Sequence, residues 1–68
     1  MAGGVVTRYS EDKGFGFTRQ DDGKEVFVER TSLDMPGYKT LNIGDRVTFD
    51  VKQTIRGLKA ENVRGLDN

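Results

Sequence analysis

The stretch KGFGF at residues 13–17, followed downstream by VFV at residues 26–28, is the most informative part of this sequence. Side chains two positions apart on a β-strand project from the same face. Phe15 and Phe17 therefore share a face, and if Val26 and Val28 point into a core, Phe27 points outward. Small stable proteins rarely expose such an aromatic patch without a binding partner. The pattern predicts an outer face that carries three phenylalanine rings.

The opposite orientation, with Phe15 and Phe17 on the inner face of a sheet, fits the spacing equally well. Two observations favour the outer face. The valines on either side of Phe27 already supply the inward side chains of that segment. Gly14 and Gly16 next to the rings are also better explained as closely packed backbone than as gaps beside buried rings. We therefore expect the rings to be exposed.

Glycines and turn residues divide the rest of the chain into short segments with alternating apolar residues, which is typical of an all-β fold. Strands are predicted over residues 4–10, 15–19, 25–29, 46–52 and 58–66, with a tight turn at Asp22-Gly23 and a long connection over residues 30–44. Ala60 and Val63 fall out of period and predict a β-bulge. Five antiparallel strands of this length suit a closed OB-fold barrel, which leaves no exposed sheet edge. The predicted core is mostly valine, with other aliphatic residues at the ends: Val6, Val26, Val28, Val47, Phe49, Val51 and Val63, with Leu33, Leu41, Ile43 and Leu58.

Composition excludes several classes of protein. Sixty-eight residues predict one domain, residues 1–68, and the absence of cysteine and histidine excludes disulfides, Cys/His zinc sites and Cys- or His-based catalysis. No apolar run reaches the roughly 20 residues that span a bilayer. We expect a cytoplasmic, monomeric protein that is not an enzyme and has no cofactor, metal or membrane partner. Because 11 basic residues balance 11 acidic ones, a nucleic-acid surface here depends on local placement of charge.

The two motifs resemble the paired ribonucleoprotein motifs of bacterial cold-shock proteins, and the similarity extends over nearly the whole chain. It includes GYKTL at residues 37–41, Gly44-x-x-Val47-x-Phe49, and Gly57-x-x-Ala60-x-Asn62-Val63. The first motif alone also fits an RNA-recognition motif, but that fold is longer, contains two helices and has its motifs in the opposite order. The resemblance implies a barrel that binds single-stranded RNA and DNA, often pyrimidine-rich, and acts as an RNA chaperone. Carried over to this chain, it assigns base stacking to Phe15, Phe17, Phe27 and Tyr38, and backbone contacts to Lys13 and Lys39.

The sequence departs from the family pattern where other rings are usual. The family's Trp-Phe-Asn is Arg8-Tyr9-Ser10 here, and its His-Phe after the second motif is Glu29-Arg30. In one interpretation, Arg8 and Arg30 stack on bases and attract phosphate, so that binding is weaker and more salt-sensitive. In another, Glu29 pairs with Arg8 or Arg30, which contributes only about 0–1 kcal/mol, and its carboxylate repels phosphate. The barrel would then serve as a protein-interaction module. Neutral surface variation is a third explanation. We favour the first, because four rings remain.

Overall fold

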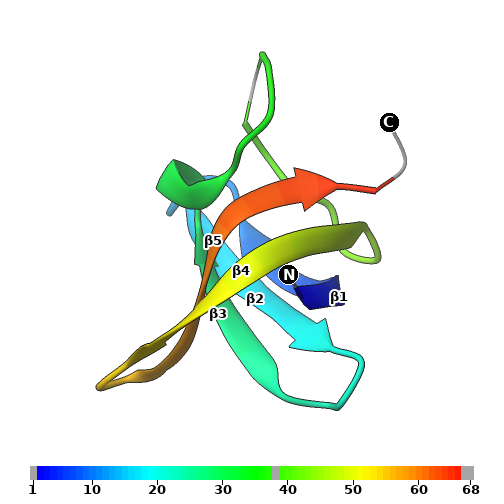
Figure 1. The fold of residues 1–68 in the computed structure, drawn as a ribbon. Helices are drawn as coiled ribbons and strands as arrows, with labels where there is room; N and C mark the ends of the chain where they lie inside the picture. The colour runs from blue at the N-terminus through cyan, green and yellow to red at the C-terminus, as the bar shows by residue number, and fades with distance from the viewer. Residues whose placement is uncertain (1, 38, 67–68) are drawn as a thin grey trace.

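The computed structural model describes residues 2–37 and 39–66, which form a closed barrel with strand order β1-β2-β3-β5-β4 (Figure 1). A short 3₁₀ helix, η1 (Arg30–Ser32), follows the third strand. Each predicted strand is confirmed, with shifts of at most two residues at its ends. The strands are β1 (Ala2–Ser10), β2 (Phe15–Gln20), β3 (Glu25–Glu29), β4 (Arg46–Thr54) and β5 (Gly57–Gly65).

One pair of neighbouring strands is parallel, although the sequence led us to expect antiparallel strands. The contact between β3 and β5 pairs Phe27 with Lys59, while the other four contacts in the barrel are antiparallel. Strand directions cannot alternate all the way around a ring with an odd number of members. A five-stranded closed barrel therefore contains at least one parallel pair. This closure brings a side chain of β5 next to the aromatic residues of β2 and β3.

The barrel encloses a small apolar core that agrees with most of the predicted set. Two predictions are wrong, because Val51 is 40% exposed and Ile43 is 71% exposed. β4 and β5 continue as a projecting hairpin (Figure 1), and residues 50–53 of β4 are all exposed, so the alternation that includes Val51 has no core behind it. Ile43 belongs to the turn before β4, whereas Leu58 packs against the core as predicted. The buried residues are Val6, Val26, Val28, Leu33, Leu41, Val47, Phe49, Ala60 and Val63.

Two local irregularities in the strand pairing bend the strands around this core. On β5, the register changes between Thr48 and Asp50 of the partner strand, and the extra residue confirms the predicted bulge. Asn62 supplies it with a φ of 53°, a left-handed conformation that asparagine tolerates better than most residues. On β1, a second irregularity lies between Val6 and Arg8. At Gly16 the β1 backbone comes so close that a Cβ would lie 2.1 Å from the carbonyl oxygen of Arg8.

Candidate nucleic-acid interface

Phe15, Phe17 and Phe27 form one group on the outer face of β2 and β3, which we call the aromatic cluster. The strand register places Phe17 opposite Phe27. The ring centroids of Phe15 and Phe27 lie 5.6 Å apart, as do those of Phe17 and Phe27. Val26 and Val28 are fully buried on the other face, and Phe15 is 36% exposed. The predicted outward orientation of the three rings is confirmed.

Lys13 lies in the turn that leads into this cluster. The turn is closed by the backbone N–H of Gly14, which donates to the carbonyl of Ser10 at 2.8 Å. The backbone N–H of Lys13 donates to Ser10 Oγ at 3.3 Å. Gly14 has a φ of 76°, which a residue with a Cβ rarely adopts. The Lys13 side chain is exposed and only two residues from Phe15, so it lies at the edge of the cluster.

Arg8 lies directly beside the aromatic cluster. It pairs with Phe17 across β1 and β2, and its guanidinium carbon is 5.4 Å from the centroid of the Phe17 ring. This distance is within the range of about 6 Å for a cation–π contact. A base that approaches Phe17 therefore meets either the guanidinium plane or the ring surface that remains after Arg8 moves aside.

Arg30 contacts the turn rather than the middle of the cluster. Its backbone N–H donates to the carbonyl of Gly14 at 2.8 Å, and its guanidinium donates to the carbonyl of Glu11. A Cβ at Gly14 would lie 3.7 Å from the Cβ of Arg30, an ordinary contact distance. The hydrogen bonds of Arg30 thus connect the end of β3 to the β1–β2 turn. Lys39 is exposed in the connection before β4, and Tyr38 lies outside the described residues.

The second interpretation, in which Glu29 pairs with Arg8 or Arg30, is wrong about the partner of Glu29. Within the described residues, Glu29 Oε1 lies 2.9 Å from Lys59 Nζ. The parallel β3–β5 contact brings Lys59 alongside β3, while Arg8 is two strands away on β1 and Arg30 turns back toward the β1–β2 turn. The pKa of Lys59 is raised above 10.5, because Glu29 accepts its hydrogen bond and attracts its charge. Lys59 is protonated at neutral pH, as an ordinary lysine is, and the pair with Glu29 favours that form further.

Sequence reasoning missed Lys59 as a neighbour of the aromatic cluster. The one local signal is its position next to Ala60, which is fully buried and therefore places Lys59 on the outer face. Nothing in the local pattern shows which strand lies next to β5. That information comes from the closure of the barrel, which pairs Lys59 with Phe27.

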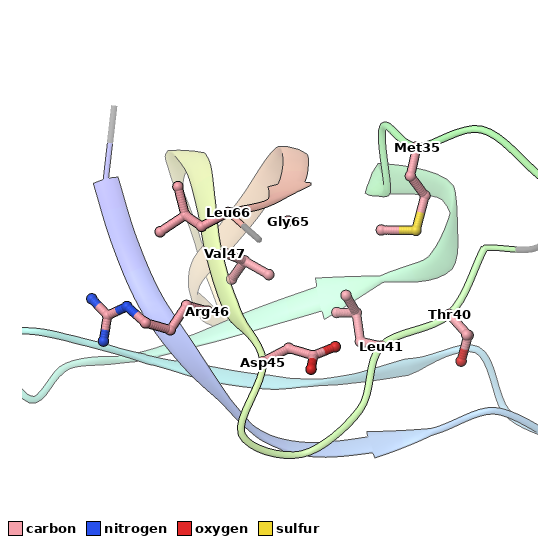
Figure 2. Close-up of a pocket in the computed structure, with 8 residues that line it drawn as sticks. All are labelled: Met35, Thr40, Leu41, Asp45, Arg46, Val47, Gly65 and Leu66. Carbon is pink, nitrogen blue, oxygen red and sulfur yellow. The ribbon is translucent and has the colours of Figure 1, made fainter. Parts of the chain in front are cut away.

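A hollow of about 290 Å³ lies between the start of β4 and the end of β5 (Figure 2). Leu41 and Val47 of the core line it together with Met35 and Leu66. The carboxylate of Asp45, which also lines it, accepts a hydrogen bond from the backbone N–H of Asn42 at 3.0 Å. No residue of the aromatic cluster lines this hollow. It is therefore a separate feature, located between the start of β4 and the end of β5.

The described residues contain no cluster of acidic, histidine or cysteine side chains that could hold a metal ion. Over the same part of the chain, no helix has the length and apolar character needed to cross a membrane.

A closed five-stranded barrel with aromatic rings and cations on its outer face is the architecture of an oligonucleotide-binding barrel. Residues 2–66 match the family model described as the 'Cold-shock' DNA-binding domain. The chain therefore belongs to the cold-shock domain family, whose members are nucleic-acid-binding proteins and not enzymes.

Individual relatives agree with this assignment. The chain is 48% identical over 64 residues to a cold shock-like protein of Aquifex aeolicus, covering 93% of this chain and 91% of that protein. It is 41% identical over 64 residues to cold shock protein CspC of Bacillus subtilis, covering 94% and 97%. Among solved structures it is similar to drosophila Unr CSD456, with a TM-score of 0.78 and 26% identity. The match covers 96% of this chain but only 26% of that longer one.

Proposed function

We propose that this protein binds single-stranded RNA or DNA by stacking bases on the aromatic cluster, with weak sequence preference, and that it acts as an RNA chaperone. The observation that carries the proposal is the outward placement of three rings on a barrel whose core is complete without them, with the Phe27 centroid 5.6 Å from the centroid of each of the other two. Stacking on such rings contributes about 1–3 kcal/mol per base and tolerates any base, because every base has a π-face. Binding of this kind holds a strand unpaired without selecting one sequence.

The cations near the cluster supply the remaining contacts in this proposal. Arg8 lies against Phe17, and Lys13, Lys39 and Arg30 are the other candidates for phosphate contacts. Family resemblance adds Tyr38 as a further stacking residue. Because charged side chains stand where the family usually has rings, we propose an altered surface that depends more on electrostatic attraction. The affinity should then fall more steeply with salt than that of a relative with the full set of rings.

The alternative function, binding of a protein partner, rests on the Glu29 carboxylate beside the aromatic cluster. An isolated carboxylate there repels phosphate. The ammonium group of Lys59 lies 2.9 Å from it and balances its charge locally. The main argument against a nucleic-acid strand on this face is thereby weakened, and single-stranded nucleic acid is the partner that the geometry supports best.

The proposal is tested by fluorescence anisotropy of a labelled oligothymidine, titrated with the protein at low and at near-physiological salt. We expect saturable binding that weakens but survives at the higher salt. Phe27→Ala should raise Kd by about 5- to 150-fold, the equivalent of about 1–3 kcal/mol for one stacked base. Binding confined to low salt would indicate charge attraction alone, and no binding at either salt would refute the proposal.

Leu66→Ala is the matched control. It removes another exposed apolar side chain, 49% exposed, but one that lies just after the end of β5, seven residues beyond Lys59, and lines the separate hollow (Figure 2). It should leave the affinity for oligothymidine unchanged. Far-UV circular dichroism checks that both variants are folded. Unfolding of Phe27→Ala would show that this ring belongs to the core and not to a stacking surface.

A further inference from the structure

Glu29 and Lys59 form a hydrogen-bonding pair at the edge of the aromatic cluster. Glu29 is opposite Phe15 across β2 and β3, and Lys59 is paired with Phe27 across β3 and β5. Glu29 Oε1 and Lys59 Nζ are 2.9 Å apart, and the two side chains remain 41% and 31% exposed, respectively. An acceptor and a donor are therefore held side by side next to the rings, within reach of solvent and of a bound strand.

We propose that this pair reads the edge of a base stacked on Phe15 and Phe27, and that it favours guanine over thymine or uracil at that position. The inference rests on the proposed function, because it requires a base on the aromatic cluster. Bases of a single strand expose their Watson–Crick edges, and proteins read single strands by hydrogen bonds to those edges.

Guanine matches the pair better than the other bases. Its edge presents two adjacent N–H donors, at N1 and N2, beside the O6 acceptor. An ionised carboxylate only accepts and an ammonium group only donates, so Glu29 suits N1 and N2 while Lys59 suits O6. Adenine and cytosine each offer one amino donor beside a ring acceptor. Thymine and uracil offer one N–H between two carbonyl oxygens. These oxygens are acceptors, so they repel the carboxylate of Glu29. The expected order is guanine first, adenine and cytosine next, and thymine or uracil last.

The ion pair does not use up the hydrogen-bonding capacity of either group. A carboxylate has about four lone-pair sites and an ammonium group has three protons. A lysine is protonated at neutral pH, and Glu29 shifts the pKa of Lys59 further upward, so the donor is present. An exposed pair of this kind contributes little to stability, so small rearrangements on contact with a base are readily made.

The test uses labelled heptathymidine in which the central base is replaced in turn by guanine, adenine or cytosine, with Kd measured by anisotropy at one salt concentration. A single guanine avoids association between strands. We expect guanine to bind at least about fivefold more tightly than thymine, and also more tightly than adenine, in line with a bidentate contact. The comparison with adenine separates edge recognition from the stronger stacking of purines in general.

Two variants connect the preference to the pair. Glu29→Ala should lower the guanine-to-adenine ratio the most, because both N–H contacts are lost, and Lys59→Met should lower it less, because only the O6 contact is lost. Leu66→Ala should preserve the wild-type ratio. If oligothymidine binds saturably, Phe27→Ala weakens it, and guanine still shows no advantage over adenine, then the edge recognition is refuted while the stacking function stands. If no oligonucleotide binds the wild-type protein, both proposals fail.

Discussion

Two adjacent glycines of β1 allow a sharp test of how closely the strands of the barrel approach one another. In Gly4→Ala, the new Cβ would lie 2.4 Å from the carbonyl oxygen of Arg19 and 3.0 Å from its carbonyl carbon. Both are backbone atoms of β2, so no flexible side chain can move aside. In Gly3→Ala, the nearest atom is the carbonyl oxygen of Val47 at 3.6 Å, an ordinary contact. The same substitution at neighbouring positions should therefore have opposite consequences.

The magnitude follows from the geometry. To restore a contact of 3.4 Å at Gly4, β1 and β2 must move apart locally by about 1 Å. Overpacking costs about 1–3 kcal/mol, and a clash against backbone belongs at the upper end of that range. The stability expected for 68 residues is only about 3–10 kcal/mol. A loss of about 3 kcal/mol lowers Tm by about 12–24 °C for a domain of this size. Gly3→Ala should leave Tm unchanged or raise it slightly, because alanine restricts the unfolded chain.

Thermal unfolding followed by far-UV circular dichroism measures both variants under identical conditions. Each variant carries one added methyl group in the same strand, so differences in composition cancel. A Gly4→Ala protein that melts within a few degrees of Gly3→Ala would refute the close approach of β1 and β2. It would also weaken the explanation of Gly16, where the approach to β1 is closer still.

Three further outcomes are expected. Asn62→Ala should lower the unfolding free energy by about 1–2 kcal/mol, because alanine is strained at a φ of 53°, whereas Asn62→Gly should lower it less; equal losses in chemical denaturation would contradict this. The Lys59 amine should titrate above 10.5 by NMR and return toward 10.5 in Glu29→Gln; its contribution to stability is present below that pH and is lost as the pH rises through the raised pKa. Arg8→Trp should tighten the binding of oligothymidine and flatten its salt dependence, whereas an unchanged affinity would place the stacking site elsewhere.

Most of the fold could be predicted because its signals are local. Alternation of apolar residues and the placement of glycines located all five strands, and the break in period at Ala60 and Val63 located the bulge at Asn62. The errors at Val51 and Ile43 have a common cause. Alternation shows which side chains share a face, but it does not show whether the barrel extends behind that face. Val51 keeps the pattern of a buried strand in a segment that has already left the core.

The site could be predicted only in part, for a related reason. The aromatic cluster comes from one hairpin, and its three residues are placed by spacing alone. The Glu29–Lys59 pair joins strands that are distant in sequence, and it depends on the parallel contact that closes the barrel. The positions of the basic residues along the chain therefore do not reveal that Lys59 is the partner of Glu29. The sequence offered Arg8 and Arg30 as possible partners of Glu29, but the folded chain directs them toward Phe17 and the β1–β2 turn.

The contact between Arg8 and Phe17 determines how a cation can stand beside a stacking surface without blocking it. A cation–π contact at an exposed site is worth about 0.5–1 kcal/mol, whereas a base stacked on the ring contributes about 1–3 kcal/mol. A base that displaces the guanidinium from Phe17 therefore gains more in stacking than the lost cation–π contact was worth, and Arg8 becomes free to contact a phosphate of the same strand. The released guanidinium adds an electrostatic contact with the phosphate, and this contribution to binding is screened by salt. We therefore expect the salt dependence of binding to decrease in Arg8→Trp, and the affinity at high salt to be set by the rings alone.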